Sequence, residues 1–236
     1  WVATANGVSV LSMDSYEKEG FKNYIYPNVN NKGPNDRRVN VVYADYAGTI
    51  WLGTEAGGLN RYNPINDTFD YFLHHPNQTN SLGGSKVQCI FEDSKHRLWI
   101  GCSGGGLNLF EPESQHFKHF TEINGLPNDD IKGIQEDAKG RLWISTDAGL
   151  SCFYPETKTF RNYNMHDGLP SNQFSVQAID RSLRDGRIYA GTKEGIAVFH
   201  PDSILNSAFV PPVYITSFKK YRTVGDKIIS QEIQGI

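Results

Sequence analysis

The stretch Gly48-Thr-Ile-Trp-Leu-Gly-Thr54 decides the fold, because related stretches occur at four other places in the chain. They read Arg-Leu-Trp-Ile-Gly-Cys around Trp99, Arg-Leu-Trp-Ile-Ser-Thr around Trp143 and Arg-Ile-Tyr-Ala-Gly-Thr around Tyr189, and the chain opens on Trp1-Val-Ala-Thr. The aromatic anchors are therefore 50, 48, 44 and 46 residues apart. A period in the forties is typical of propeller blades, small sheets that bury their faces only by stacking on neighbours.

The composition also favours an all-β protein. The chain of 236 residues has 12% aromatic residues, 23 glycines and only 21% charged residues, which suits many short strands joined by tight turns. Its net charge of -3 gives no electrostatic reason to expect nucleic acid as a partner. No run approaches the roughly 20 apolar residues that span a bilayer. Because the chain opens inside a repeat, we expect it to be part of a longer protein.

Each repeat predicts a meander of four strands. A first strand of mostly alternating apolar residues leads through a polar turn into the Trp strand, and two more strands follow. A glycine stands six residues after every anchor, so the second turn is expected to need a positive φ or a close backbone approach. Each first strand ends in an aspartate whose carboxylate is expected to stabilise the following turn, and these are Asp45, Asp93, Asp137 and Asp180.

The three cysteines are predicted to be small buried hydrophobic residues. Cys89, Cys102 and Cys152 fall in predicted strands, and their spacings match no zinc or redox motif. One disulfide with a leftover thiol is the alternative.

The repeat resembles the two-component regulator propeller repeat over about residues 1–202. The shared pattern is a strand ending in Asp, a turn with Gly, Leu-Trp-Ile-Gly-Thr, a Gly-Gly-Leu step, an aromatic strand and a Gly-Leu-Pro connector. Departures are Ser145 in place of Gly, Tyr189 in place of Trp, and a shifted turn at residues 184–187. Beyond the repeats, Phe209-Val-Pro-Pro-Val-Tyr-Ile-Thr-Ser-Phe218 resembles the opening of the triple-tyrosine β-sandwich domain that follows such propellers in membrane sensor kinases.

The predicted architecture is an all-β propeller fragment of about four and a half four-stranded blades, forming an open arc rather than a closed ring. Its expected parts are a partial blade at 1–36, blades at about 37–84, 85–128, 129–172 and 173–205, and the truncated start of the β-sandwich at 209–236. An open arc exposes edge strands and apolar blade faces, so we expect self-association as a homodimer.

Candidate ligand-binding residues lie on one face of the predicted arc. The connectors between blades and the turns between second and third strands share that face and differ from unit to unit, which is typical of recognition loops. Four candidates precede first strands and are expected nearest the axis: Arg37, Lys86, Asp130 and Gln173. The full set, with solvated surface as the alternative for each, is Arg37, Arg38, Glu55, Lys86, Asp129, Asp130, Asp147, Gln173, Lys193 and Glu194.

The chemistry of this set suits hydroxyl-rich or charged sugars, since acids, bases and amides are mixed with nearby aromatic residues. No catalytic residue, metal site or cofactor is expected. His116 and His119 are three apart on one predicted strand and should point to opposite faces.

The resemblance implies a non-catalytic sensor region of a hybrid two-component histidine kinase, acting in phosphorelay and transcription regulation. Such a region lies in the periplasm as part of a membrane-anchored protein of the inner membrane and responds to oligosaccharides. This region is not expected to contact nucleic acid. Two alternatives remain open. One is a protein-binding or dimerisation scaffold, and the other is a propeller lyase that would use Asp129 and Asp130 with Glu55 or Asp147.

Overall fold

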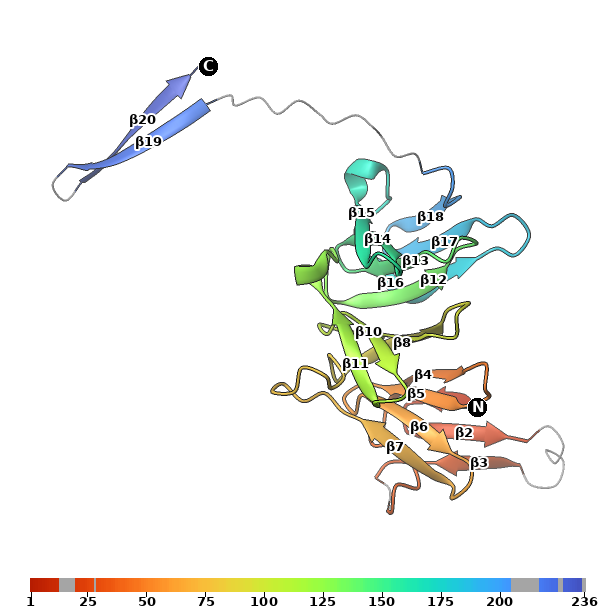
Figure 1. The fold of residues 1–236 in the computed structure, drawn as a ribbon. Coiled ribbons are helices and arrows are strands. Elements are labelled where there is room, and N and C mark those ends of the chain that lie inside the picture. Colours follow the sequence, from red (N-terminus) through yellow and green to blue (C-terminus); the bar gives the residue numbers. More distant parts are fainter. Residues whose placement is uncertain (13–19, 28, 205–216, 225–226, 235–236) are drawn as a thin grey trace. The chain divides into compact units, whose positions relative to one another are not determined.

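The computed structural model describes residues 1–12, 20–27, 29–204, 217–224 and 227–234. It divides the chain into two units, Trp1–Ser203 and Ile204–Ile236. In the second unit, β19 (Ser217–Val224) pairs with β20 (Lys227–Gln234) as an antiparallel hairpin (Figure 1). Residues 209–216, which carry most of the predicted triple-tyrosine motif, lie outside the described residues. Within the described residues no helix has the length and apolarity that crossing a membrane would require.

The first unit consists of antiparallel sheets whose strands are ordered along the chain, as expected for blades. Blade 1 has three strands, blades 2, 3 and 4 have four each, and blade 5 has three in the described part of the chain. The strands are β1 (Val2–Thr4), β2 (Gly7–Leu11) and β3 (Phe21–Tyr24) in blade 1; β4 (Val39–Ala44), β5 (Ile50–Thr54), β6 (Leu59–Asn63) and β7 (Thr68–Phe72) in blade 2; β8 (Val87–Glu92), β9 (Leu98–Cys102), β10 (Leu107–Glu111) and β11 (His116–Phe120) in blade 3; β12 (Ile131–Glu136), β13 (Leu142–Thr146), β14 (Gly149–Tyr154) and β15 (Thr159–Tyr163) in blade 4; and β16 (Phe174–Arg181), β17 (Ile188–Thr192) and β18 (Gly195–Phe199) in blade 5.

The blades follow one another in chain order, which Figure 1 shows as a succession from red to blue. The first strands β4, β8, β12 and β16 are neighbours in that order. No strand of blade 5 pairs with a strand of blade 1 among the described residues. The all-β fold and the open arrangement predicted from the sequence are therefore confirmed.

The repeating aspartate is part of the scaffold in the three full blades. The indole Nε1 of Trp99 donates to Asp93 Oδ2 over 2.8 Å, and the Arg97 backbone N–H donates to Oδ1 of the same carboxylate over 3.0 Å. Blades 2 and 4 repeat this arrangement around Asp45 and Asp137. The expectation for Asp180 is wrong. Among the described residues, its exposed carboxylate accepts only from the adjacent Arg181 N–H, because the shifted turn of blade 5 is closed from Ser182.

The glycine after each anchor has two structural roles. Gly7 and Gly149 have φ values of 104° and 124°, in the left-handed region that favours glycine. Gly57 and Gly105 lie in turns one residue longer, and the positive φ falls on the next residue. A side chain at Gly105 would collide with the backbone of Gly83, so this glycine is required by close approach instead.

The departure at Ser145 is compensated on the neighbouring strand. At this position of the Trp strand, blades 2 and 3 have glycine opposite a larger residue, whereas blade 4 has serine opposite glycine. A Cβ on Gly133 would lie 2.6 Å from Ile179 Cγ2 of blade 5 and 3.2 Å from the Ser145 hydroxyl, so a side chain has no room opposite Ser145. The cross-strand pairs are Val41 with Gly53, Cys89 with Gly101, and Gly133 with Ser145.

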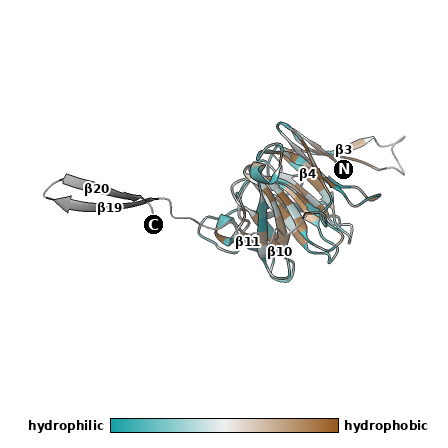
Figure 2. Ribbon diagram, turned by 90° about the horizontal axis from the view of Figure 1, so that it is seen from above, coloured by the Kyte–Doolittle hydropathy of each residue, from teal (hydrophilic) through white to brown (hydrophobic). Residues whose placement is uncertain are grey.

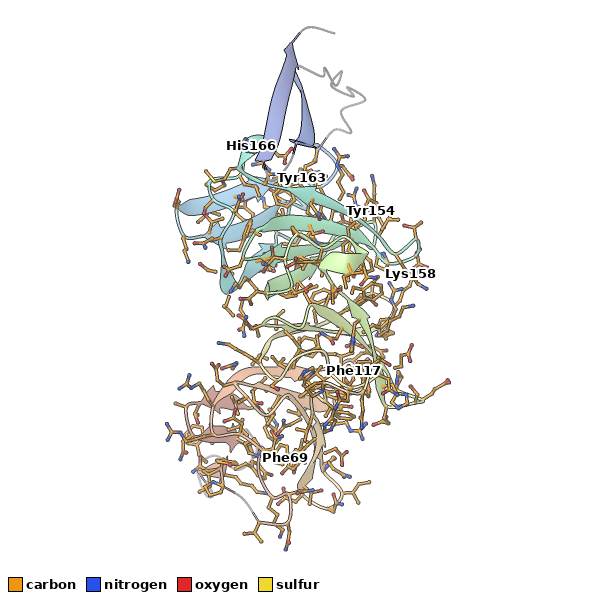
Figure 3. The ribbon with its side chains drawn as sticks, turned by 90° about the vertical axis from the view of Figure 1, so that its left-hand side faces the viewer. Phe69, Phe117, Tyr154, Lys158, Tyr163 and His166 are labelled. Carbon is orange, nitrogen blue, oxygen red and sulfur yellow. The ribbon has the colours of Figure 1, made fainter. Side chains whose placement is uncertain are left out.

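The hydrophobic core lies between consecutive blades rather than at one centre. Trp99 and Trp143 are 1% exposed, and each packs against an aromatic residue of the following blade, Phe153 and Phe199 respectively. Figure 2 shows hydrophobic residues concentrated in the strands of this unit. In Figure 3, Phe69, Phe117 and Tyr163 mark the outermost strands of three successive blades.

The three cysteines are free and buried, which confirms the prediction. Burial raises the pKa of all three thiols, to about 12 for Cys102 and to about 11 for Cys152.

Candidate ligand site at the axis of the arc

The first strand of each full blade contains a β-bulge directly after its first residue. The pairing with the Trp strand shifts between Val39 and Val41 in blade 2, and the same shift recurs in blades 3 and 4. A bulge re-aims the side chain of the extra residue. In blade 5 the pairing is broken over a longer segment, between Phe174 and Ile179. The residues at these irregularities include Asn40, Gln88, Lys132 and Gln177.

Gln177 connects the first strands of three blades. Its side-chain Nε2 donates to the backbone carbonyl of Asn40 over 3.2 Å and to that of Gln88 over 2.8 Å. These residues are 137 and 89 positions earlier in the chain. The φ of Gln177 is 55°, a left-handed conformation that non-glycine residues seldom adopt. The bulged first strands therefore converge on a common axis, and Gln177 crosses it.

A cavity of about 340 Å³ opens beside this crossing. Its walls come from blades 2, 3 and 5 and are mostly polar. The lining residues are Asn40, Glu55, Lys86, Gln88, Val176 and Gln177. None of them is aromatic, so the nearby aromatic residues expected from the sequence do not line this cavity.

A salt bridge between blades forms one wall of the cavity. Lys86 Nζ lies 3.0 Å from Glu55 Oε1, and Asn40 Nδ2 donates to Glu55 Oε2 over 3.1 Å. Arg38 is 3.8 Å from the same carboxylate. The hydrogen bond from Lys86 lowers the pKa of Glu55, and Asn40 and Arg38 act in the same direction. Glu55 is therefore a carboxylate at neutral pH.

A second polar group lies between blades 3 and 4. Gln88 Nε2 donates to Asp130 Oδ1 over 2.5 Å, and Lys132 Nζ lies 3.0 Å from Asp130 Oδ2 and 3.6 Å from Asp147 Oδ1. Gln88 belongs to both groups, since its side chain also lines the axial cavity. The structure thus brings together Arg38, Glu55 and Lys86 in one group and Asp130 and Asp147 in the other.

Three of the remaining candidates lie elsewhere. Lys193 Nζ donates to the Gln173 side chain over 2.8 Å within blade 5, and Glu194 is exposed in the neighbouring turn.

Arg37 and Asp129 also lie outside these groups. The side chain of Arg37 is exposed, and its backbone carbonyl accepts from Gly7. Asp129 accepts the Glu122 backbone N–H over 2.7 Å, and burial raises its pKa. Asp129 and Asp130 therefore point to different partners and do not form the paired carboxylates that a lyase would need.

Sequence reasoning missed the bulge residues Asn40, Gln88, Lys132 and Gln177. It placed the axial positions just before the first strands, whereas the bulge brings the second strand residue to the axis. A usable signal was present in the three full blades, because Asn40, Gln88 and Lys132 each stand second in the first strand, between non-polar neighbours. Gln177 is the fourth residue of β16 and does not follow this pattern.

Besides the Glu55–Lys86 salt bridge, the cavity is lined by neutral amide side chains that can form hydrogen bonds with a ligand. The side-chain amides of Asn40, Gln88 and Gln177 use their N–H groups within the protein, and no bond to their side-chain oxygens is formed by the described residues. Those oxygens are available to accept from a hydroxyl-bearing ligand. No group of three or more His, Cys, Asp or Glu residues in the described segments is placed to hold a metal ion.

Five antiparallel meanders around a polar axis define the class of protein: an open β-propeller arc. The model of the two-component regulator propeller family matches residues 81–104 and 125–148. These two segments are therefore two-component regulator propeller repeats, and the resemblance inferred from the sequence is confirmed there.

Similar solved structures are propellers as well. Two structures of the extracellular domain of BT4673 from B. thetaiotaomicron have TM-scores of 0.72 and 0.70. The first is described as part of a proposed one-component system and the second as part of a proposed hybrid two-component system. They are 20% and 18% identical to this chain, and the matches cover 86% and 98% of it. The β-propeller domain of Cps50 (Swd1) from Myceliophteria thermophila has a TM-score of 0.56 at 13% identity, covering 83% of this chain and 64% of that one.

At these identities the structures show the fold alone. The chain spans 28% and 32% of the length of the two BT4673 domains. Comparison with curated proteins gave no match.

Proposed function

We propose that this chain is a non-catalytic part of the extracytoplasmic sensor region of a hybrid two-component histidine kinase. The proposal is supported by the two regulator propeller repeats and by the description of the BT4673 domains as extracellular parts of such a signalling system. In this proposal the parent protein is anchored in the inner membrane, and the arc lies in the periplasm. The kinase and response-regulator parts belong to the remainder of the parent protein.

The ligand proposed is a carbohydrate, bound in the axial cavity. The observation that carries this choice is the convergence of Asn40, Gln88 and Gln177 from three blades with their amide oxygens unused. Sugar hydroxyls donate to such oxygens, and Glu55 and Lys86 add one acceptor and one donor of opposite charge. The absence of aromatic side chains from the lining favours a hydroxyl-rich ligand held by hydrogen bonds over one held by ring stacking.

Signalling would follow from the position of Gln177 between blades 2, 3 and 5. A ligand that takes over the carbonyl groups of Asn40 and Gln88 would release β16 from the first strands of blades 2 and 3. Such a ligand binds one arrangement of the blades better than the other, which is the requirement for shifting a conformational equilibrium. The altered position of blade 5 would then be passed to the domain that follows it.

Thermal unfolding against a panel of oligosaccharides tests this proposal. A bound ligand at a hundred times its Kd stabilises by about 2.7 kcal/mol, a readily measured shift of the melting temperature. We expect Lys86→Met to weaken the response to the active sugar at least tenfold. Lys193→Met is the matched control, because Lys193 pairs with Gln173 away from the cavity.

A saturating response that both variants retain would disprove the axial site. The absence of any response across neutral and acidic oligosaccharides would disprove the carbohydrate assignment. Release of shortened or unsaturated products from the panel would show that the region is catalytic, contrary to the proposal.

A second role, self-association, is favoured by the outer face of blade 5. Tyr189, Ile196 and Val198 are 42%, 66% and 47% exposed. The corresponding residues of blade 4, Trp143 and Leu150 among them, are 1% exposed because blade 5 covers them. We propose that a second copy of the chain covers the face of blade 5. Sedimentation velocity should then show a dimer that Ile196→Asp dissociates, and a monomer at all concentrations would contradict this role.

A further inference from the structure

The interface between blades 3 and 4 is closed by a clamp of two cations and two carboxylates. Arg97 Nε lies 2.6 Å from Asp93 in its own blade, and its Nη1 lies 3.2 Å from Glu156 in the next blade. Lys95 Nζ is 2.7 Å from the same Glu156. Because Arg97 also lies over the ring of Trp99, at 5.6 Å, its guanidinium fills the space between the blades.

The interface between blades 4 and 5 is closed in the same way. Arg141 Nε lies 2.6 Å from Asp137, and its Nη2 lies 3.0 Å from Asp202 of blade 5. Lys139 Nζ is 2.7 Å from Asp202. The cations stand two and four residues before the Trp, and the distal acid follows the proline after the third strand. The clamp is therefore a property of the repeat.

Between blades 2 and 3 the acids of the clamp are present and both cations are missing. The positions two and four residues before Trp51 hold Thr49 and Ala47. Asp45 still binds the Trp51 indole, and Glu113 follows Pro112 as Glu156 follows Pro155. Glu113 makes no ion pair with any of the described residues.

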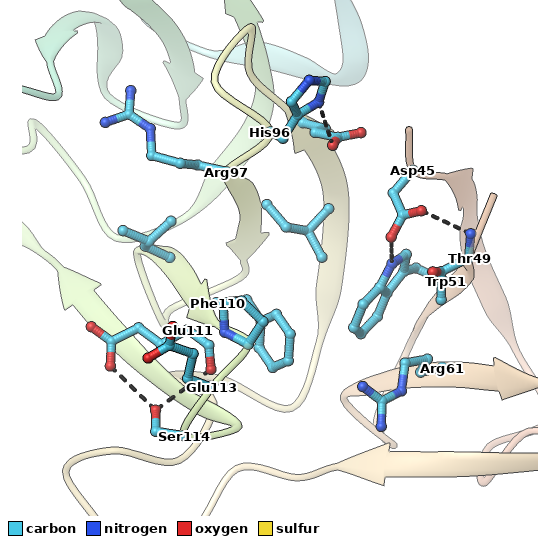
Figure 4. A pocket seen from close by; sticks show the side chains of 14 residues that line it. Asp45, Thr49, Trp51, Arg61, His96, Arg97, Phe110, Glu111, Glu113 and Ser114 are labelled. Atoms are coloured by element: carbon cyan, nitrogen blue, oxygen red, sulfur yellow. Dashed lines mark hydrogen bonds and ion pairs between the residues drawn. The ribbon is translucent and has the colours of Figure 1, made fainter. Parts of the chain in front are cut away.

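A cavity of about 720 Å³ lies at this interface, with Asp45, Thr49 and Trp51 on one side and Phe110 and Glu113 on the other (Figure 4). The indole and phenyl rings of Trp51 and Phe110 form an apolar wall, with ring centroids 5.2 Å apart. The replacement of Arg by Thr and of Lys by Ala leaves this interface without the two cationic side chains that cross each of the other two.

The basic side chains that line this cavity already have acidic partners. Arg61 Nη2 lies 2.8 Å from Asp70, Arg97 binds Asp93, and His96 Nδ1 lies 3.1 Å from Glu92. The Arg61 guanidinium lies over the Trp51 ring, 5.8 Å from its centroid, but it pairs with Asp70 and not with Asp45. Figure 4 shows Arg61 and Asp45 on opposite sides of the Trp51 indole, so Arg61 does not supply the missing partner of the Asp45 carboxylate.

Within the described part of the chain, the Asp45 carboxylate, by contrast, accepts only from uncharged donors. These are the Thr49 backbone N–H and the Trp51 indole N–H, each over 2.8 Å. In blades 3 and 4 the equivalent oxygen of the aspartate also accepts from an arginine Nε.

We propose that the cavity between blades 2 and 3 binds a guanidinium group supplied from outside the chain. The guanidinium donates to Asp45 and Glu113 and lies against Trp51, in the position that Arg97 and Arg141 occupy at the other interfaces. The fork of N–H donors on a guanidinium suits two carboxylates on facing walls better than a compact ammonium group does. The group belongs either to a small free molecule or to an arginine side chain of another polypeptide.

Isothermal titration calorimetry at low ionic strength tests the proposal with free arginine amide and with citrulline amide, in which a neutral urea group replaces the guanidinium. Arginine amide should bind with one site, and citrulline amide should bind at least tenfold more weakly. A capped peptide with one central arginine distinguishes the two sources. Tighter binding of the peptide identifies a polypeptide partner, and tighter binding of the free amide identifies a small ligand.

Two variants test whether the heat of binding measured by calorimetry arises from this cavity. Thr49→Arg supplies the missing guanidinium from within the chain, so it should abolish binding while raising the melting temperature. Glu113→Gln should weaken binding at least tenfold. Asp202→Asn is the matched control, since it breaks the clamp between blades 4 and 5, whose cations do not line this cavity, and should leave binding unchanged.

Equal binding of arginine amide and citrulline amide, or no binding of either, would overturn the proposal. Full binding by a folded Thr49→Arg variant would do the same. Because this cavity shares no lining residue with the axial one, these outcomes are independent of the carbohydrate proposal.

Discussion

Asp93 and Trp99 form one unit in which a single buried carboxylate organises a whole blade. The Asp93 side chain has no exposed surface and accepts the Trp99 indole N–H over 2.8 Å. It also accepts the backbone N–H groups of Lys95 and Arg97, each over 3.0 Å, and it pairs with the Arg97 guanidinium. The same residue therefore fixes the turn, the anchor of the Trp strand and the cation that reaches the next blade.

Removing the charge of Asp93 should destabilise the protein markedly. Asp93→Asn keeps the size of the side chain but weakens several charge-assisted hydrogen bonds, each contributing about 1.5–3 kcal/mol. We expect the free energy of unfolding, measured with urea, to fall by about 3 kcal/mol. Asp180→Asn is the control, because this exposed carboxylate supports no turn, and it should change the free energy of unfolding by less than about 0.5 kcal/mol. Similar losses for the two variants would contradict the role given to Asp93.

Blade 3 should tolerate the arrangement of blade 4, in which the Trp strand carries serine and the neighbouring first strand carries glycine. Gly101→Ser alone places a side chain against Cys89 and Ile131, and overpacking of this kind costs about 1–3 kcal/mol. Adding Cys89→Gly reproduces the pair Gly133 and Ser145, so the double variant should recover at least half of the loss. Chemical denaturation of the four proteins in a double-mutant cycle measures this coupling. Simple addition of the two single losses would show that the exchange is not compensatory.

The contact between blades 1 and 2 should weaken in acid. The hydrogen bond from Lys22, followed by those from the Tyr24 and Tyr62 hydroxyls, lowers the pKa of Asp67 to about 2. Since the folded pKa is below the unfolded value, the stabilisation is complete above about pH 4 and is lost as pH falls towards 2. The side chain of Asp67 is 40% exposed, so we expect less than about 1 kcal/mol.

Hydrogen exchange of β3 at pH 6 and pH 3 measures this effect. Exchange from the native state should be faster at pH 3 after correction for the intrinsic rate. In Asp67→Asn the difference between the two pH values should disappear, and its persistence there would assign the effect to another group.

The cysteine thiols should be unreactive in the folded protein. Burial raises the pKa of Cys102 to about 12 and that of Cys152 to about 11, so the thiolate is scarce near neutral pH. We expect alkylation at pH 8 to be more than about 100-fold slower than in denaturant. Stability should also decline as pH rises above about 9, because the unfolded thiols ionise first. Rapid labelling of one cysteine under native conditions would show that its strand opens locally.

The sequence predicted the architecture well because the repeat provides its own comparison. The Trp anchors, the aspartates six residues before them and the prolines after the third strands each recur at a fixed place in the blades. Asp180 shows the limit of this reasoning, since a shifted turn removes the geometry that gives the aspartate its role. The pairing of Gly133 with Ser145 was equally hidden, because each residue is informative only when the register between their strands is known.

The candidate site was predicted less completely. Glu55 and Lys86 were chosen from their place in the variable loops, and they do line the axial cavity. Asn40, Gln88 and Gln177 were missed because a bulge changes which residue faces the axis, and a bulge depends on pairing between strands. The cavity beside Thr49 could be found from the sequence only as a missing arginine, since its acids belong to two different blades.

The side chain of Gln177 already binds two of the backbone carbonyl groups at the axial cavity. Its amide already uses the carbonyls of Asn40 and Gln88, so a ligand that needs them must first displace a group tethered to the same protein. Such an intramolecular competitor has a fixed effective concentration and would lower the affinity for every ligand of this kind by the same factor. In the proposed function, Glu55, Lys86 and Gln88 would then set the selectivity among sugars, and Gln177 would set the threshold concentration for a response.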